Sequence, residues 1–184
     1  MEHHISLPLT AEQFSSIRAG DAVYLSGRIL TARDAAHKRL MKLIDEGGAL
    51  PFPLEGAAVY YAGPCPAPEC MPIGSCGPTT SSRMDSYAPR LIALGLKVMI
   101  GKGQRSPAVV QAIREHGGLY LAATGGAGAL YARCVREARV VAFDDLGAEA
   151  VRELVVEEMP LIAAIDCRGG NLYDEARAQS AAEG

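Results

Sequence analysis

Apolar residues along the chain follow two patterns, short continuous runs and stripes at helical spacing. The runs predict buried strands at 23–30, 57–61, 97–100, 119–122, 140–143 and 161–165. The stripes predict helices at 10–17, 31–46, 85–94, 107–116, 128–135 and 148–157, followed by a polar helical tail from residue 173. Alternation of the two kinds of element predicts an α/β layered fold.

Local signals mark where several of these helices should begin and end. Residues 10–13 have the spacing of a capping box, and Thr31 is the expected cap of the next helix, which Gly47-Gly48 should end. The step Gly77-Pro78 is typical of a helix start. Because the first N–H groups of a helix lack partners within it, an anion would fit in front of the hydroxyl-rich run that follows this step.

Composition and charge limit the class of protein. With 184 residues, of which 49% are apolar, the chain can bury a substantial core, and we expect a single domain over 1–184. A formal net charge of −3 argues against a nucleic-acid partner, because binding to phosphate backbones needs a basic surface. No basic and apolar leader and no run of about 18 apolar residues are present, so we expect a cytoplasmic protein with no membrane partner.

The five cysteines are Cys65, Cys70, Cys76, Cys134 and Cys167. An odd number of cysteines without an export signal argues against a disulfide framework. The spacing of the first three differs from the paired C-x-x-C spacing of zinc ribbons, so no metal ligand is expected in this chain. A zinc protein built on these three cysteines stays open as an alternative.

Cations and hydroxyl groups gather near predicted strand ends and helix starts. Arg33 lies in the first turn of the second helix, and Lys102 stands between two glycines after a strand. The hydroxyls of Thr79 and Thr80 precede Arg83. Such a set suits a small dianion, for example a dicarboxylate held by arginines. Two simpler explanations stay open, since Lys102 can be an exposed turn residue and Arg33 can belong to a solvated basic helix face.

Two glycine-rich turns follow predicted strands. Gly101-Lys102-Gly103 differs from a phosphate loop, because Gly103 replaces the Ser or Thr that would hold magnesium. The glycines at 125, 126 and 128 can present N–H groups to a carboxylate or phosphate, and close packing of a helix on a sheet explains them equally well.

Taken together, the chain resembles the C-terminal domain or β subunit of class I, iron–sulfur dependent fumarate hydratases and of the related L(+)-tartrate dehydratases. The resemblance runs from about residue 5 to about residue 173. The stretches that carry it are Leu7-Pro8-Leu9-Thr10, Gly20-Asp21, Gly27, Thr31-Ala32-Arg33-Asp34-Ala35-Ala36-His37, Gly63-Pro64, Gly77-Pro78-Thr79-Thr80-Ser81-Ser82-Arg83-Met84-Asp85, Gly101-Lys102-Gly103, and Gly125-Gly126 with Ala129-Leu130.

The resemblance implies a swivelling β/β/α layered domain that closes over a partner. That partner, an α subunit, would hold a four-iron four-sulfur (4Fe-4S) cluster with its own cysteines, so Cys76 is not expected to be a ligand. The implied enzyme is heteromeric, with a homodimer of the αβ unit expected. It would be a hydro-lyase that interconverts fumarate and L-malate, a step of the tricarboxylic acid cycle.

The resemblance also implies roles for individual residues. Thr79 would transfer the C3 proton, with Lys102 as a second catalytic group that stabilises its alkoxide, while Arg33, Arg83 and Thr80 would bind the substrate. The open iron of the partner's cluster would bind the 2-hydroxyl group as a Lewis acid. This chain on its own is therefore expected to be inactive. The alternatives are an L(+)-tartrate dehydratase β subunit and, in a different class, a non-catalytic module that binds an organic anion.

Overall fold

The computed structural model describes residues 1–182, and the last two residues of the domain expected over 1–184 lie outside the described residues. The chain contains both helices and strands, which confirms the expected α/β class. In order these are β1 (Glu2–Ser6), α1 (Ala11–Ser16), β2 (Ala22–Thr31), α2 (Asp34–Asp45), β3 (Ala58–Tyr60), the 3-10 helix η1 (Ser81–Met84), α3 (Ala88–Ala93), β4 (Val98–Gly101), α4 (Pro107–His116), β5 (Leu119–Ala122), α5 (Gly128–Cys134), β6 (Val135–Ala142), the 3-10 helix η2 (Asp144–Glu149), β7 (Val151–Ile165) and α6 (Leu172–Ala182).

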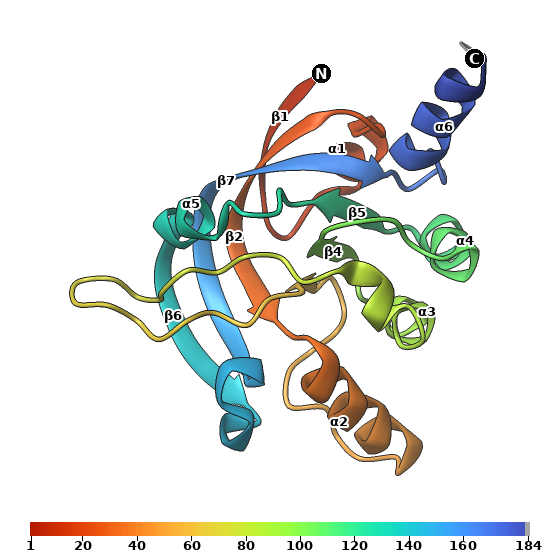
Figure 1. Cartoon of the computed structure of the whole chain (residues 1–184). Helices are drawn as coiled ribbons and strands as arrows, with labels where there is room; N and C mark the ends of the chain where they lie inside the picture. Colours follow the sequence, from red (N-terminus) through yellow and green to blue (C-terminus); the bar gives the residue numbers. More distant parts are fainter. Residues whose placement is uncertain (183–184) are drawn as a thin grey trace.

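The strands form one sheet that closes on itself. Their order is β1-β2-β3-β4-β5-β7-β6, and an additional pairing of β2 with β7 joins β2, β3, β4, β5 and β7 into a small barrel (Figure 1). Strands β1 to β5 run parallel to one another, whereas β7 runs antiparallel to β2, β5 and β6. The carboxyl ends of β2, β3, β4 and β5 therefore meet at one edge of the sheet.

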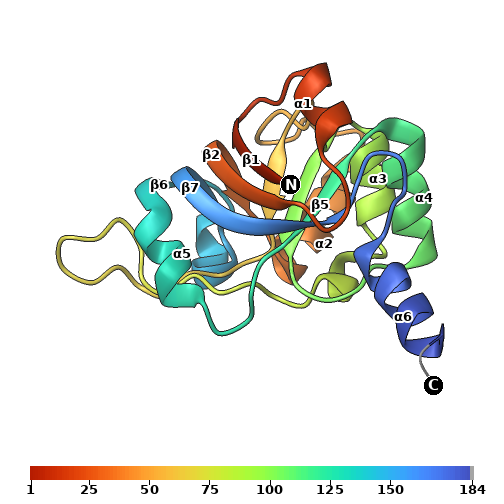
Figure 2. The same cartoon turned by 90° about the horizontal axis from the view of Figure 1, so that it is seen from above.

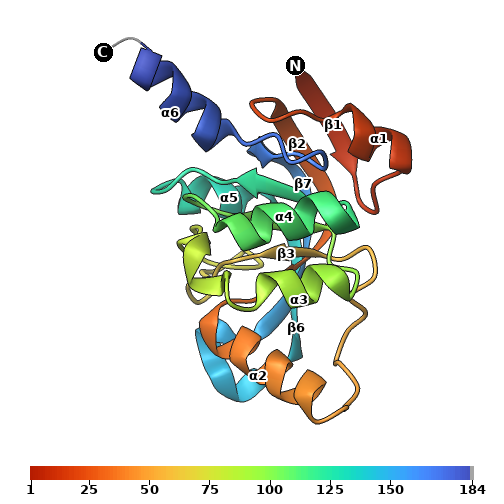
Figure 3. The same ribbon diagram turned by 90° about the vertical axis from the view of Figure 1, so that its right-hand side faces the viewer.

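Successive residues of the parallel strands point into two different apolar cores. On β4, Val98 and Ile100 belong to the first core, and Met99 belongs to the second. On β5, Leu119 and Leu121 face the first core, and Tyr120 faces the second. Helices α2, α3 and α4 lie side by side over the second core (Figure 3). Burial on both faces explains why these strands are continuous apolar runs in the sequence.

The prediction of a helix at 148–157 is wrong, because these residues lie mainly in the long strand β7. The spacing of Val151 and Leu154 fits a helical stripe, yet Leu154 and Val156 are buried at the period of a strand. Strand β2 pairs along this stretch, from Gly27 opposite Val156 to Thr31 opposite Arg152. Pairing with a distant strand therefore overrides the local pattern.

Other boundaries also differ from expectation. Strand β1 was not predicted, and β6 begins at Val135 instead of near residue 140. Thr31 is the last residue of β2, and its hydroxyl accepts a hydrogen bond from Arg152 N, whereas the cap position of α2 is Arg33. The capping box at residues 10–13 is confirmed, with Thr10 and Gln13 bonded to each other reciprocally.

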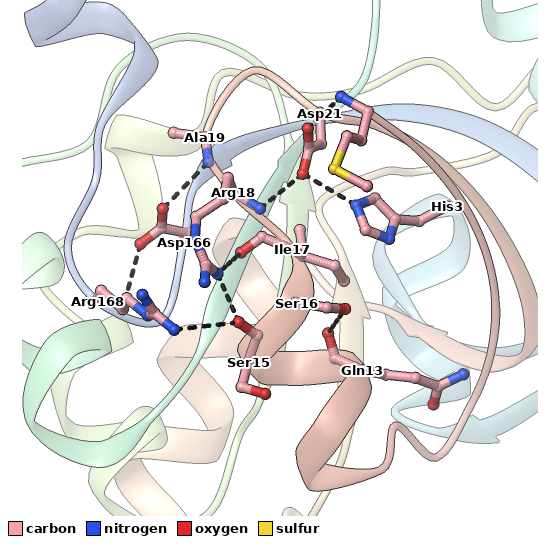
Figure 4. A network of polar contacts seen from close by, with 11 residues as sticks. His3, Gln13, Ser15, Ser16, Ile17, Arg18, Ala19, Asp21, Asp166 and Arg168 are labelled. Carbon is pink, nitrogen blue, oxygen red and sulfur yellow. Dashed lines mark hydrogen bonds and ion pairs between the residues drawn. The ribbon is translucent and has the colours of Figure 1, made fainter.

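A polar network secures the chain where β2 begins and β7 ends (Figure 4). The carboxylate of Asp21 accepts hydrogen bonds from the N-terminal amine, from His3 Nε2 at 2.9 Å and from Arg18 N at 2.8 Å. Burial opposes ionisation, but these hydrogen bonds lower the pKa of Asp21 to about 2. Asp166, which follows β7, accepts a further bond from Ala19 N at 3.1 Å. The network stabilises the edge of the barrel at which β2 begins.

The segment between β3 and η1 projects from the barrel. It is drawn in yellow in Figure 1, and Figure 2 shows it beside α5. Cys65 and Cys70 lie in this segment and are exposed. Within residues 1–182, none of the helices combines the length and the apolar character that crossing a bilayer requires.

Candidate active site

The carboxyl ends of the parallel strands bring the predicted site residues to one edge of the sheet. Arg33 follows β2, Gly63 follows β3, Lys102 directly follows β4 and Gly125 follows β5. A Cβ atom placed on Gly63 would lie 3.3 Å from Arg33 Cδ, so the backbone after β3 packs against the Arg33 side chain. In parallel sheets this edge is the usual place for ligand-binding groups.

The segment with Thr79 and Thr80 is extended and lies between the chain after β3 and the chain after β4. Thr79 N donates to Tyr61 O at 2.6 Å, and Ser81 N donates to Lys102 O at 2.9 Å. Lys102 N in turn donates to Thr79 O at 3.4 Å. The threonine segment and Lys102 are therefore held together by their backbones.

These bonds correct the expectation that Gly77-Pro78 starts a helix. Pro78 forms an isolated antiparallel bridge with Ala62, and η1 begins only at Ser81. Because the N–H groups of Thr79 and Ser81 bond to carbonyl groups from other segments, they are not available to an anion. The structure therefore does not support an anion site on these two N–H groups in front of a helix.

The two arginines share one carboxylate. Asp34 Oδ1 accepts from Arg83 Nε at 2.8 Å, and Asp34 Oδ2 accepts from Arg33 Nε at 3.3 Å. Arg33 Nε also lies 3.5 Å from Glu149 Oε1 of η2. Burial opposes ionisation of Asp34, but its own backbone N–H and the two guanidinium groups lower its pKa. Asp34 is thus ionised near pH 7, and it brings both arginines together.

The Nε contacts leave one edge of each guanidinium group available. Within residues 1–182, the Nη atoms of Arg33 and Arg83 have no hydrogen-bond partner. The Arg33 side chain is 26% exposed, and that of Arg83 is 51% exposed. An arginine held at Nε can present both Nη atoms to a carboxylate, which is the bidentate geometry that favours this pairing.

The lysine lies beside the glycine loop that follows β5. A Cβ atom on Gly125 would lie 3.8 Å from Lys102 Nζ, so the loop runs along the lysine side chain. Gly128 has a different role, because a Cβ atom there would overlap Ser75 Oγ and lie 2.9 Å from Gly77 N. Close packing against the residues just before the threonine segment therefore explains Gly128.

Sequence reasoning missed the buried groups beneath this edge. Arg105 has a fully buried side chain whose Nε donates to Asp85 Oδ1 at 2.6 Å. The rings of Tyr61 and Tyr120 flank its guanidinium group. Asp85 ends the threonine motif and was visible in the sequence, but no spacing signal connects it with Arg105.

Comparison with known proteins decides the family. The family described as Fumarase C-terminus matches residues 2–176. The chain belongs to this family. It is 38% identical over 173 residues to a putative L(+)-tartrate dehydratase subunit beta from Methanocaldococcus jannaschii, which covers 91% of this chain and 89% of that relative. The family resemblance inferred from the sequence is confirmed.

Longer relatives are fumarate hydratases. The anaerobic class I fumarate hydratase of Escherichia coli is 38% identical over 165 residues, and fumarate hydratase 2 of Leishmania major is 37% identical over 166 residues. Each alignment covers 89% of this chain. This member of the Fumarase C-terminus family spans 30% and 29% of the length of these two relatives.

The cysteines of this Fumarase C-terminus member lie in different surroundings. Cys65 and Cys70 are exposed, whereas Cys76 is buried. Burial, together with the neighbouring Cys65, raises the pKa of the Cys76 thiol to about 12, which disfavours the thiolate that a metal needs. In the part of the chain that the structure describes, no three His, Cys, Asp or Glu side chains are placed to hold a metal ion. These residues do not fit an iron–sulfur cluster.

His37 is buried beside the arginine pair. Its Nδ1 lies 2.9 Å from Arg33 O, so the hydrogen-bond pattern places the ring proton on Nδ1. Among the described residues, its Nε2 atom has no partner. Burial, with a smaller effect of Arg105, lowers the pKa of His37 to about 4, although Arg33 O and Asp34 oppose this change. The ring therefore stays neutral near pH 7.

This burial predicts a loss of stability in mild acid. Below about pH 6.5 the unfolded chain binds a proton at His37, while the folded chain binds it only near pH 4. The free energy of unfolding should thus fall by up to about 3 kcal/mol as the pH drops through this window. Urea unfolding across the window should show a shallower pH dependence for His37→Gln. His116→Gln, at an exposed histidine, is the matched control, and equal slopes for His37→Gln and the parent chain would contradict the prediction.

Proposed function

We propose that this chain is the β subunit of a hydro-lyase that hydrates and dehydrates a small dicarboxylate, with fumarate and L-malate as the substrate pair. The observation that supports it most is the gathering of Arg33, Thr79, Arg83 and Lys102 at the carboxyl edge of β2 to β5. Two arginines held by one carboxylate suit a dianion. A threonine hydroxyl group whose alkoxide form a lysine cation stabilises suits proton transfer.

The reaction divides naturally among these residues. Dehydration of L-malate removes a proton from C3 and the hydroxyl group from C2, so that a trans double bond and water form. We assign acceptance of the C3 proton to Thr79 in its alkoxide form, which becomes a hydroxyl group as the C3 electron pair forms the double bond, with Lys102 as the cation that stabilises the alkoxide. Arg33, Arg83 and Thr80 would bind the substrate carboxylates and fix its orientation.

L(+)-tartrate is the second candidate substrate. The relative of matching length is named as a tartrate dehydratase β subunit, whereas the fumarate hydratase relatives are about three times longer than this chain. L-malate and L(+)-tartrate both carry two carboxylates and a 2-hydroxyl group. The same arginines and the same proton-transfer group would serve either one.

The assembly is a further part of the proposal. We propose that residues 1–184 form one domain that swivels over an α subunit, that the α subunit ligates the 4Fe-4S cluster, and that two αβ units form a dimer. The absence of a fitting cluster site in residues 1–182 and the relative named as a β subunit both support a shared site. The odd number of cysteines supports a reducing cytoplasmic location.

Co-purification tests this proposal. The chain expressed with its α subunit under anaerobic conditions should yield a brown complex that interconverts fumarate and L-malate, while the chain alone should be colourless and inactive. Assays on L(+)-tartrate identify the preferred substrate through kcat/KM. Malate and fumarate turnover by the purified single chain would refute the shared site, and a colourless complex without turnover would favour a module that only binds anions.

A further inference from the structure

The two segments that carry Thr79 and Lys102 are joined a second time, below the surface. Asp85 Oδ1 accepts from Arg105 Nε, and Asp85 Oδ2 accepts from Ser106 N, each at 2.6 Å. Asp85 ends the segment that carries Thr79, and Arg105 ends the turn that carries Lys102. Both carboxylate oxygens are thus used to hold one segment against the other.

Tyr120 of β5 makes a separate link between the same segments. Its hydroxyl oxygen lies 2.8 Å from Gly103 O and 2.9 Å from Ser81 Oγ. A phenol has one proton and a carbonyl oxygen can only accept, so Tyr120 donates to Gly103 and Ser81 donates to Tyr120. Ser81 follows the threonine pair, and Gly103 follows Lys102.

Arg105 supports both links. Its guanidinium carbon lies 4.9 Å from the centre of the Tyr120 ring and 5.3 Å from that of Tyr61. Tyr61 is the residue whose carbonyl oxygen accepts the Thr79 N–H group. The buried guanidinium group of Arg105 therefore contacts three groups. They are Tyr61, which bonds to Thr79, Tyr120, which bonds to Gly103 next to Lys102, and the carboxylate of Asp85.

A role in stability alone does not explain this arrangement. A buried ion pair costs desolvation, and apolar residues of similar volume often stabilise a fold as well or better. The bonds of Asp85 and Tyr120 are instead directional, and each spans the same pair of segments. Directional bonds that span two functional segments fix their separation.

We propose that Arg105 and Tyr120 are positioning residues that set the distance between the Thr79 hydroxyl group and the Lys102 ammonium group. Arg105 acts through Asp85 and the two tyrosine rings, and Tyr120 acts through Ser81 and Gly103. This inference rests on the proposed function, in which Thr79 moves a proton under the influence of Lys102. Neither residue touches the substrate in this scheme.

Tyr120→Phe in the αβ complex tests the proposal, because the ring that flanks Arg105 is kept and only the hydroxyl link is lost. The kcat for L-malate should fall about 10-fold while KM changes by less than about twofold. The isotope effect with L-malate deuterated at C3 should rise, because the misplaced group slows proton transfer. Arg105→Lys keeps the positive charge but loses the planar guanidinium group with its several N–H donors, and it should lower kcat about 100-fold. Tyr24→Phe, on β2, is the matched control and should behave as the parent complex.

The outcomes separate this inference from the proposed function. An active parent complex with an unaltered kcat and isotope effect in Tyr120→Phe overturns the positioning role alone. The positioning role is also overturned if kcat falls only in proportion to the fraction of complex that is folded, with the isotope effect unchanged. A variant in which KM rises and kcat is unchanged overturns it as well. A parent complex without hydro-lyase activity overturns the proposed function and this inference together. If Arg105→Lys does not fold, Tyr120→Phe decides.

Discussion

Thr79→Ala is expected to lower kcat of the αβ complex about 1,000-fold, with the affinity for substrate largely retained. General acid and base groups contribute on this order, and alanine cannot accept or return the C3 proton. The backbone bonds of Thr79 to Tyr61 and Lys102 do not involve its side chain, so the segment should keep its position. Steady-state kinetics on L-malate, together with binding of a non-reacting dicarboxylate, measure the two effects separately.

Ser82→Ala is the matched control for this change. Ser82 is an exposed hydroxyl residue in the same motif, and its loss should leave kcat within about twofold of the parent value. Thr79→Ser, which keeps the hydroxyl group, should recover part of the activity. Full turnover by Thr79→Ala in a correctly assembled complex would refute the proton-transfer role.

Arg33→Lys should raise KM for the dicarboxylate about 10- to 100-fold, with a smaller fall in kcat. The free Nη edge of Arg33 can bind a carboxylate through two parallel hydrogen bonds, whereas an ammonium group offers a single point charge. Hydrogen bonds to charged groups contribute about 1.5–3 kcal/mol each, which corresponds to this range. Arg83→Lys should have the same direction of effect, since both arginines are bonded to Asp34.

Arg39→Lys serves as the control for the arginine change. Arg39 lies on α2, whose cap position is Arg33, and its guanidinium group bonds to Asp145 at 2.7 and 2.8 Å. It has no part in the proposed site, and KM should not change. An unchanged KM in both Arg33→Lys and Arg83→Lys would mean that these arginines do not bind the substrate.

Much of the architecture follows from local pattern. The apolar stripes of α2 and α4 and the apolar runs of β4 and β5 were identified at or near their observed bounds, because each pattern reports a buried face directly. The capping box before α1 was also visible, since its two partners are three residues apart. Strand β7 was mistaken in part for a helix because its partner, β2, lies more than a hundred residues earlier in the chain.

The candidate site, too, was predictable from the sequence only in part. Residue types and motif order pointed to Arg33, Thr79, Thr80, Arg83 and Lys102. Their roles stay predictions. Asp34 appeared only within the stretch of residues 31–37 that carries the resemblance, and nothing in the spacing indicated that it bonds to Arg83. Glu149 was not noticed, because it contacts Arg33 from a segment distant in sequence. Arg105 lies close to Lys102 in the chain, but its partner Asp85 is 20 residues away and no local pattern connects the two.

The sequence by itself therefore determined the alternation of strands and helices, the family, and the chemical types of the candidate site residues, since these depend on residue identity and on spacing along the chain. The tertiary structure decided that the strands close into a barrel, that Gly77-Pro78 leads into an extended segment, that Asp34 bonds to Arg83, and that Arg105 bonds to Asp85. The physical reason is that each of these features depends on hydrogen bonds or ion pairs between residues far apart in sequence. Such contacts form only when the strand edges bring the segments together.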